Sequence, residues 1–416
     1  MNKEATAEEL TKKRWLMVII SGLMNICAGS LYTWSVFSSP MAEYLNQRTG
    51  LALTAGSLAI VFTVANSVGP ITMISGGFIN DKLGPKWVLF LGGLLFGGGF
   101  LLSGFAVNTP MLIAGFGVCS GLAMGMIYGC SVSNAVKWFP DRRGMIGGIM
   151  TATYGLSSVI VPPIANSMIQ SLGVTAAFKI LGAIFVLVLC VGSFFITPCP
   201  PNFVPAGWTP PAVTKSNPSN EKNWSGMLHT PVFYVMLAIL VCGAFSGLML
   251  ISQASNMAQQ MVGMTAEAAA IVVSVLALFN VAGRVVSGWL SDKIGRIRTL
   301  EIAFLIAVAG LAMLLLSNGN VALFYGGISF VGFCFGSLMG IYPGFTADRF
   351  GQKHNSVNYG IMFIGFALAG LFGPMSMNLM YQKSGSYQPA FIASMVLAVI
   401  GILLAQVYKM MSKKKS

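Results

Sequence analysis

The sequence is short of charged residues, and shortest of acidic ones. Only 8% of its 416 residues are Asp, Glu, Lys or Arg, whereas charged residues make up about a quarter of an ordinary soluble domain. So few charges cannot cover a globular surface, which excludes soluble, fibrous and disordered proteins. Apolar runs of about 20 residues repeat along the chain instead, and runs of that length cross a bilayer as helices. The sequence therefore predicts a polytopic membrane protein.

Motifs for catalysis, metals and nucleotides are also missing. The seven cysteines are scattered without metal-ligand spacing, and there are only two histidines. No Ser-His-Asp set is visible, and the glycine-rich GFGVCSG lies inside an apolar run rather than after a strand. We therefore expect no enzyme, no metal site and no cofactor. Without an ATP-binding motif, any transport must be secondary.

The apolar runs form two sets of six on either side of a polar, proline-rich stretch. This pattern predicts an all-α membrane protein with twelve transmembrane helices in two six-helix halves. The predicted domains are an N-terminal half at 1–197, a cytoplasmic linker loop at 198–228 and a C-terminal half at 229–416. The predicted spans are 15–38, 52–77, 86–106, 110–136, 144–170, 174–197, 229–259, 265–289, 298–317, 320–345, 355–381 and 388–410.

The basic residues gather in the connections on one side of the predicted membrane. The chain has 24 Lys and Arg against 11 Asp and Glu, a formal net charge of +13. If both termini are cytoplasmic, most of the basic residues fall on the inner side, as the positive-inside rule expects. The excess therefore reflects orientation in a lipid bilayer rather than a nucleic-acid partner. We expect a multi-pass protein of the cytoplasmic (inner) or plasma membrane with both termini cytoplasmic.

One charged motif occurs twice. GGFINDKLGPK runs from Gly76 to Lys86, and SGWLSDKIGRIR runs from Ser287 to Arg298. The shared Asp-Lys pairs begin at Asp81 and Asp292, about half a chain apart. Two parallel halves that rock about a central site are built from repeats of this kind.

Arg284 lies in the middle of an apolar run, SVLALFNVAGRVVSGWL. An arginine at the bilayer centre costs about 2.5–3.5 kcal/mol on insertion scales, so it needs a partner. All 11 acidic residues map to termini, loops or span ends, and an anionic substrate is then the predicted partner. The alternative is a structural arginine that snorkels or bonds helix carbonyls. Asn280 lies four residues earlier on the same helix face and can orient the guanidinium.

Several motifs together resemble a known family. The repeated Gly-x-x-x-Asp-Lys-x-Gly-x-Arg/Lys loop resembles the signature of the major facilitator superfamily. The further motifs are SLYTWSVFSSP (Ser30–Pro40), GMIYG (Gly125–Gly129), KWFPDRRG (Lys137–Gly144) and NVAGR…SDKIGR (Asn280–Arg296). With these, nearly the whole chain resembles the oxalate/formate antiporter family, which neighbours the monocarboxylate transporters. The resemblance implies the major facilitator fold and transport by alternating access, but it does not fix the substrate.

The resemblance also implies roles for individual residues. In that family the arginine that matches Arg284 binds the substrate carboxylate. Tyr32 and Tyr128 match positions that reach the substrate, and Phe335 and Phe363 match positions where the oxalate carrier has tryptophan. The alternative for these aromatic residues is ordinary packing or contact with lipid. Asn280 stands where monocarboxylate transporters have a proton-carrying aspartate, which puts proton symport by that route in doubt.

The family's second cation is missing. The oxalate carrier has a lysine six residues beyond an Asn-Tyr-Gly motif, and this chain has Phe366 there. One arginine matches one carboxylate, so we predict transport of a small monocarboxylate such as lactate, pyruvate or formate. Coupling is by exchange or by proton symport, in which case protons are also partners. The alternatives are an oxalate/formate antiporter and a transporter-like carboxylate sensor, and we expect a functional monomer.

The charged residues of the repeated loop have a different predicted role. In the superfamily such loops latch neighbouring helices in the outward-open state, which implies gating. The alternative is that they are kept charged for topology alone. The residues are Asp81, Lys82, Lys86, Asp292, Lys293 and Arg296.

Overall fold

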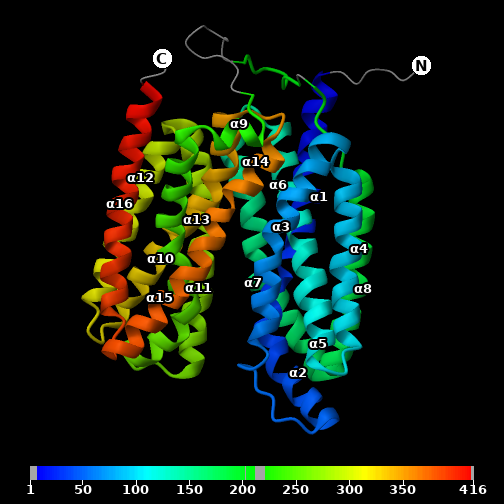
Figure 1. Ribbon diagram of the computed structural model, residues 1–416, viewed down its shortest axis with the longest axis vertical. Helices are drawn as coiled ribbons and strands as arrows, with labels where there is room; N and C mark the ends of the chain where they lie inside the picture. Colours follow the sequence, from blue (N-terminus) through cyan, green and yellow to red (C-terminus); the bar gives the residue numbers. More distant parts are fainter. Residues whose placement is uncertain (1–6, 202, 211–220, 414–416) are drawn as a thin grey trace. The chain divides into compact units, whose positions relative to one another are not determined.

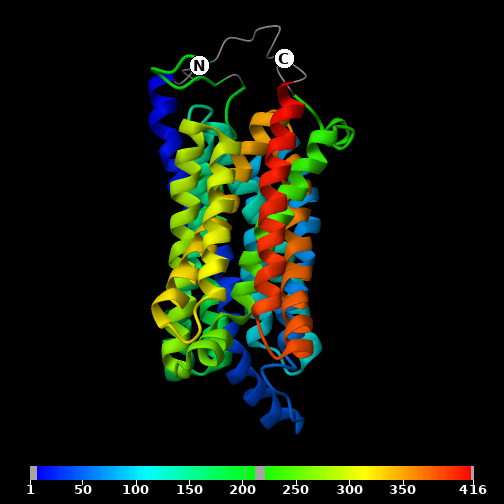
Figure 2. The ribbon, with the colours of Figure 1, turned by 90° about the vertical axis from the view of Figure 1, so that its left-hand side faces the viewer.

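The computed structural model describes residues 7–201, 203–210 and 221–413, and its regular secondary structure there is entirely helical. Within those ranges, twelve helices are long and apolar enough to cross a membrane. The predicted all-α class and the predicted number of spans are therefore confirmed. The long helices of each unit run roughly alongside one another (Figures 1 and 2).

The elements follow the order of the predicted spans. Those of the first half are α1 (Ala7–Ala28), η1 (Gly29–Thr33), α2 (Trp34–Thr49), α3 (Ala59–Leu83), α4 (Pro85–Gly104), α5 (Thr109–Leu112), η2 (Ile113–Ser120), α6 (Gly121–Trp138), α7 (Arg143–Leu172) and α8 (Val174–Phe195). Those of the second half are α9 (Trp224–Leu228), α10 (Pro231–Val262), α11 (Ala266–Ile294), α12 (Arg296–Leu315), α13 (Val321–Phe350), α14 (Asn355–Met362), α15 (Ile364–Ser384) and α16 (Gln388–Lys413).

Several helix ends follow from local sequence. The Asn108 side chain accepts a hydrogen bond from the Met111 N–H at the start of α5, and Asn320 caps α13 in the same way. Such side chains satisfy N–H groups that have no partner within the helix. The helices α10 and α15 end at Gly263 and Gly385, both in the left-handed conformation that glycine adopts without strain.

The chain forms two compact units. Unit 1 comprises Met1–Asp141, Thr153–Thr209 and Lys353–Ile361, and unit 2 comprises Arg142–Ala152, Pro210–Gln352 and Met362–Ser416. Each unit thus takes one short segment from the other half of the sequence. The first turns of α7 belong to unit 2, and most of α14 belongs to unit 1. The boundaries predicted from the sequence stay a prediction, and their linker lies partly outside the described residues.

Helices in unit 1 pack through glycines and phenylalanines. A Cβ atom at Gly97 of α4 would lie 2.6 Å from the carbonyl oxygen of Gly182 in α8, so only glycine allows this approach. Between these helices and η2 lies a cluster of aromatic rings with neighbouring centroids 5.0–6.1 Å apart. Its members are Phe96, Phe100, Phe116, Phe178 and Phe185.

In unit 2, a glycine stripe brings α13 against α11. Gly332, Gly336 and Gly340 lie four residues apart on α13. A Cβ at Gly336 would overlap the carbonyl oxygen of Asn280, and a Cβ at Gly340 would overlap that of Arg284. The stripe therefore sets the position of the stretch of α11 that carries these two residues.

The helices are less regular than the predicted spans. The first span is interrupted by the 3-10 helix η1, the fourth contains the π-helix η2, and Phe363 separates α14 from α15. A second difference concerns the repeated motif, which the sequence placed between spans. Asp81 lies in the last turns of α3 and Asp292 in those of α11, because both helices continue until a glycine of positive φ, Gly84 or Gly295, ends them.

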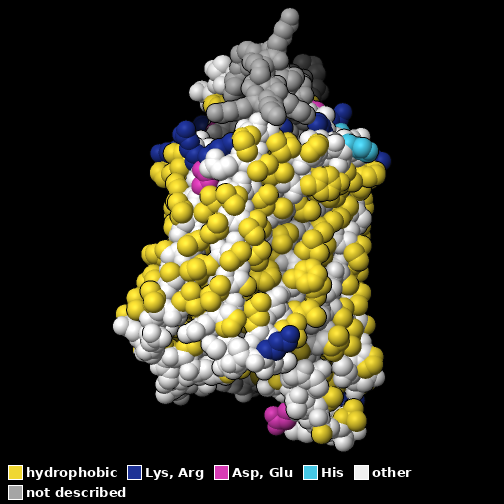
Figure 3. Space-filling view, turned by 60° about the vertical axis from the view of Figure 1, so that its left-hand side comes forward, with side chains coloured by type: hydrophobic (Ala, Val, Ile, Leu, Met, Phe, Trp, Pro, Cys, Tyr) yellow, Lys and Arg dark blue, Asp and Glu magenta, His cyan; other side chains and the backbone are white. Residues whose placement is uncertain are grey.

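The outer surface has the composition of a lipid-facing one. Figure 3 shows one face covered mainly by hydrophobic side chains, with Lys and Arg gathered towards one end. On α12, Ile302 is 41% exposed and Leu305 60%, and Leu403 of α16 is also 60% exposed. Large exposed apolar side chains at this density suit hydrocarbon, not water. The protein is a multi-pass membrane protein.

Candidate functional site

Arg284 is buried in the middle of α11, with 5% of its surface exposed. Its Nε donates a hydrogen bond of 2.8 Å to Oδ1 of Asn280, as their spacing of four residues predicts. Its Nη1 donates to the carbonyl oxygen of Thr151 in α7, at 2.5 Å. Among the described residues, Arg284 has no ion pair. The charged guanidinium is therefore hydrogen-bonded by two neutral oxygens. One of them, the carbonyl oxygen of Thr151, is the kind of helix acceptor that a purely structural arginine would use.

The guanidinium retains hydrogen-bonding capacity beyond these two contacts. Arginine has five N–H donors in a planar fork. Asn280 and Thr151 take one donor each, and Nη2 makes no hydrogen bond within the part of the chain that the structure describes. This arrangement can bind one carboxylate through a forked pair of charge-assisted hydrogen bonds.

Phenylalanine rings form a stack in the same unit. The rings of Phe335 in α13 and Phe366 in α15 are 6.2 Å apart and inclined by 24°. Phe366 also stacks on Phe363, at 4.5 Å and 21°. The two phenylalanines predicted from the sequence are thus joined by Phe366, the residue found in place of a second cation. An apolar stack offers a surface for carbon chains and no charge for a second carboxylate.

Tyrosines gather in unit 1. The Tyr154 ring lies edge-on to Tyr32 at 5.6 Å and to Tyr128 at 4.9 Å. The hydroxyl oxygens of Tyr128 and Tyr359 are 3.5 Å apart. We call these four residues the tyrosine group; they come from η1, α6, α7 and α14. Tyr128, Tyr154 and Tyr359 are buried, so their hydroxyls lie in a low-dielectric setting where hydrogen bonds are strong.

Sequence reasoning missed Tyr154 and Tyr359. Tyr359 belongs to the Asn-Tyr-Gly motif, which served only to locate the absent cation, and its own hydroxyl was not considered. No motif pointed to Tyr154. One general signal for the site is a break in a helix, because transporter binding sites often lie at broken helices. Tyr32 lies in the 3-10 segment η1 and Phe363 lies at the break before α15.

The predicted substrate residues therefore fall into two groups. Tyr32 and Tyr128 lie together in unit 1. In unit 2, Asn280 and Arg284 are in direct contact, and Phe335 and Phe363 are linked by the ring of Phe366 between them.

Asp292 connects three elements at the end of unit 2 that carries Arg296, Arg298 and Arg349, which we call its basic end. Its carboxylate forms a 2.6 Å ion pair with Arg296 and accepts from the backbone N–H groups of Gly144 (2.8 Å) and Met145 (2.7 Å). These N–H groups begin α7, where the helix dipole favours negative charge. Arg296 reaches on to Asp348 of α13 at 2.8 Å.

Asp81 makes a related set of contacts in unit 1. It forms a 2.6 Å ion pair with Lys137 and accepts from the Val357 N–H in the first turn of α14 at 3.3 Å. The motif aspartates therefore each meet the start of another helix. The motif lysines do not: Lys86 lies over the Phe194 ring at 4.6 Å, and Lys293 lies over the Trp289 ring at 3.9 Å.

Lys82 is exposed and makes no hydrogen bond or ion pair within the described ranges. Contacts of the kind that a latch needs thus involve three of the six residues predicted for gating: Asp81, Asp292 and Arg296.

The structure bears on metal binding by the described residues and on the reactivity of one cysteine, Cys199. In the described part of the chain no three His, Cys, Asp or Glu residues come together as metal ligands. Cys199, outside the membrane spans, donates from its thiol to the carbonyl oxygen of Lys137 at 3.3 Å. Burial raises the pKa of this thiol to about 12, against a smaller opposing effect of Lys137. The thiol therefore stays protonated at neutral pH.

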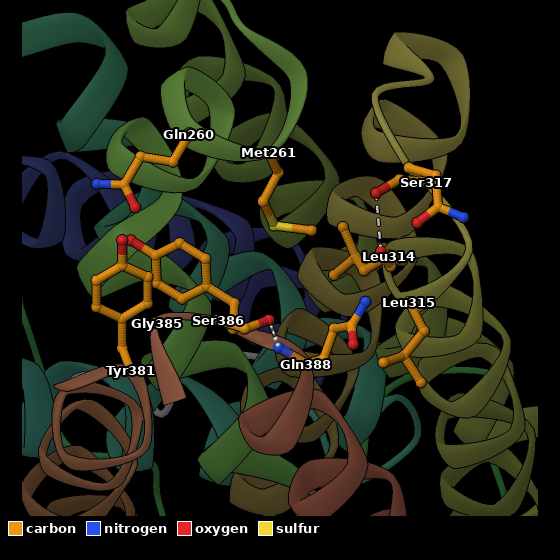
Figure 4. A pocket seen from close by; sticks show the side chains of 11 residues that line it. Gln260, Met261, Leu314, Leu315, Ser317, Tyr381, Gly385, Ser386 and Gln388 are labelled. Carbon is orange, nitrogen blue, oxygen red and sulfur yellow. Dashed lines mark hydrogen bonds between the residues drawn. The ribbon is translucent and has the colours of Figure 1, made fainter. Parts of the chain in front are cut away.

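A pocket of about 270 Å³ lies at the other end of unit 2, where α10, α12 and the turn between α15 and α16 meet (Figure 4). Its polar lining is uncharged and includes Gln260, Ser317, Tyr381 and Gln388. None of the predicted substrate residues lines it.

Comparison with known proteins identifies the family. The Major Facilitator Superfamily matches residues 15–374. The chain belongs to this superfamily. Within it, the chain is 31% identical over 369 residues, 88% of each protein, to an uncharacterised MFS-type transporter of Escherichia coli strain K12, YhjX. It is therefore a transporter of the major facilitator type.

Two further relatives match the predicted resemblance. The oxalate:formate antiporter of Oxalobacter formigenes is 28% identical, with 97% of this chain and 94% of that protein covered. Human monocarboxylate transporter 12 is 25% identical, with coverage of 96% and 81%. The resemblance to these two kinds of transporter is thus confirmed.

A solved structure supports the major facilitator fold. The Escherichia coli fucose:proton symporter FucP matches with a TM-score of 0.70 and 15% identity, covering 94% of this chain and 98% of that one. At this identity the similarity concerns the fold alone.

Proposed function

We propose that this major facilitator protein is a secondary active transporter of a small monocarboxylate of the lactate, pyruvate or formate type. One observation carries the proposal: Arg284 is buried within a membrane span and has no carboxylate partner among the described residues. A buried charge without a counter-ion is costly. A substrate carboxylate that reaches Arg284 would supply the missing charge.

Two features of unit 2 favour one carboxylate over two. Asn280 holds the guanidinium at Nε and leaves Nη2 for an anion. Phe335, Phe363 and Phe366 offer apolar rings, so a short carbon chain suits them better than a second charge. In this proposal the hydroxyls of Tyr32 and Tyr128 complete the binding of the carboxylate oxygens.

Transport would proceed by alternating access between the halves at 1–197 and 229–416, with both termini in the cytoplasm. Asp81, Asp292 and Arg296 would hold helix starts at the basic end and release them during the cycle. The protein would move its substrate unchanged, without catalysis, by exchange or by proton symport. Because Asn280 cannot carry a proton, we favour exchange.

Uptake by purified protein in proteoliposomes tests the proposal. Vesicles would be loaded with unlabelled pyruvate or unlabelled formate and given labelled L-lactate, pyruvate, formate or oxalate, with protein-free vesicles as the control. We expect exchange of at least one monocarboxylate and none of oxalate. A second run with a pH gradient and empty vesicles separates proton symport from exchange.

The alternatives give different results. Exchange of oxalate for formate would show that one guanidinium is sufficient for a dicarboxylate, and the relation to the Oxalobacter antiporter favours testing it first. Binding of a monocarboxylate without exchange would indicate a sensor. Absence of both binding and flux for all four anions would refute a carboxylate carrier.

A further inference from the structure

The basic end of unit 2 contains a second pocket, of about 350 Å³, where α12 begins beside α13 and α16. Its lining includes three arginines: Arg296, Arg298 and Arg349. Asp348 and Tyr408 line it as well. We call it the basic pocket. None of the residues that we assign to the substrate lines it, and it shares only Arg296 with the contacts that we assign to gating. Lipid binding there does not depend on which substrate is transported.

Among the residues that the structure describes, two of the three arginines have no carboxylate partner. Arg296 is neutralised by Asp292 at 2.6 Å and Asp348 at 2.8 Å. Arg298 and Arg349 form no ion pair within the described part of the chain. The next acid along α12, Glu301, is taken by Lys409 of α16 at 2.6 Å. The basic pocket therefore carries an excess of positive charge.

The start of α12 adds to this excess. Its first turn contains no acidic residue, and Gly295 before it provides no side-chain cap. The helix dipole favours negative charge at this position, but the sequence places Arg296 and Arg298 there. An anion in the basic pocket would offset both the arginines and the uncapped N–H groups.

An apolar stripe continues from the basic pocket along α12. Arg298, Ile302 and Leu305 follow one another at spacings of four and three residues, so they lie on one helix face. Ile302 is 41% and Leu305 60% exposed, and Leu403 of neighbouring α16 is 60% exposed. Arg298 thus shares a helix face with exposed apolar side chains of the kind that contact hydrocarbon.

We propose that the basic pocket binds the phosphate of an anionic phospholipid headgroup, whose acyl chain lies along Ile302 and Leu305. The predicted cytoplasmic position of this end places the basic pocket at the leaflet where basic segments meet anionic lipids. A free phosphate would satisfy the arginines equally well but would make no use of the apolar stripe. The stripe therefore favours the lipid.

Retention of labelled lipid by the purified full-length protein in detergent tests the proposal. The probes are labelled phosphatidylglycerol and, as the neutral reference, labelled phosphatidylcholine. We expect the protein to retain phosphatidylglycerol in preference. The double variant Arg298→Gln/Arg349→Gln should weaken that binding about thirtyfold, because each basic side chain contributes a factor of about five. The matched control, Lys12→Gln/Lys13→Gln, removes the same charge from exposed residues of α1 and should leave binding unchanged.

Competition experiments on the unaltered protein distinguish the lipid from a free anion. Unlabelled phosphatidylglycerol should displace the probe, whereas inorganic phosphate and glycerophosphate at the same concentration should not. Equal displacement by inorganic phosphate would mean that the basic pocket takes a free anion, and it would overturn the proposal. Equal retention of both lipids by the unaltered protein, or equal loss in the two double variants, would overturn it as well.

Discussion

The two units repeat one arrangement of contacts around the motif aspartates Asp81 and Asp292. They differ in the other polar and aromatic side chains that they bury. In unit 1, Asp81 at the end of α3 pairs with a cation and accepts an N–H from the start of α14. In unit 2, Asp292 at the end of α11 does the same with the start of α7. Beyond these charged contacts, unit 1 carries the tyrosine group, whereas unit 2 carries a buried arginine.

The repeated contacts and the side chains that differ meet different requirements of a transporter. The repeated part follows from the duplicated motif and suits any carrier built from two halves. The part that is not repeated contains one cation, one amide and a set of aromatic rings, and in the proposed function these residues select the anion. The predictions below test the two parts separately, from the largest expected effect to the smallest.

Loss of the charge at Arg284 should have the largest effect. We expect Arg284→Gln to lower monocarboxylate uptake by about a hundredfold, because two charge-assisted hydrogen bonds contribute about 3 kcal/mol or more. Initial rates in proteoliposomes measure this. In the matched variant Asn280→Asp, the new carboxylate competes with the substrate and should raise KM. Unchanged uptake by Arg284→Gln would mean that the arginine is structural.

A change that forces α11 away from α13 should have the second-largest effect. We expect Gly336→Ala to destabilise the protein by about 1–3 kcal/mol, since the added Cβ would overlap the backbone of Asn280, which cannot turn aside. The thermal midpoint of the purified protein measures this. Gly370→Ala is the control, because its Cβ would meet only Leu248, at 3.6 Å. Equal midpoints for both variants would contradict the close approach.

Substitution of the motif aspartates Asp81 and Asp292 should destabilise the protein to different extents. Asp292→Asn leaves one oxygen for two backbone N–H groups and breaks the pair with Arg296, whereas Asp81→Asn loses one pair and a longer hydrogen bond. We expect each variant to lose about 1–3 kcal/mol of unfolding free energy, and Asp292→Asn the more, because it leaves a backbone N–H of α7 without its acceptor. The thermal midpoint of the purified protein measures this. Adding Arg296→Gln to Asp292→Asn should restore part of the loss. A larger loss for Asp81→Asn would reverse the comparison.

The smallest effect is expected in the tyrosine group. Tyr359→Phe removes the hydroxyl that lies 3.5 Å from that of Tyr128. We expect KM to rise about threefold to tenfold, the effect of one neutral hydrogen bond, with little change in kcat. Tyr381→Phe, which alters a tyrosine outside this group, should leave KM unchanged. An equal change in both variants would argue against a role for the tyrosine group.

Much of the fold could be predicted from the sequence because apolar run length and motif spacing can be read along the chain without knowledge of tertiary contacts. Apolar length gives the spans, whereas the two equivalent halves that the duplicated Asp81 and Asp292 motifs indicate stay a prediction. The contact between Asn280 and Arg284 could also be predicted, since a spacing of four residues fixes it on any helix.

Other features depended on tertiary contacts and could not be predicted. The bond from Arg284 to Thr151 joins residues 133 positions apart, through a backbone group that has no sequence signature. Tyr154 meets Tyr32 and Tyr128 only because three helices converge. The breaks at η1 and Phe363 arise without a proline or a glycine run to announce them, and the extension of α3 and α11 through the charged motif depends on where Gly84 and Gly295 adopt positive φ.

The central claim is that Arg284 binds a carboxylate, and ligand-dependent thermal stability tests it without requiring flux. A ligand that binds the folded state raises the thermal midpoint. We predict that pyruvate stabilises the unaltered protein, that the uncharged analogue pyruvamide does not, and that neither stabilises Arg284→Gln. Stabilisation of Arg284→Gln by pyruvate, equal to that of the unaltered protein, would contradict the account.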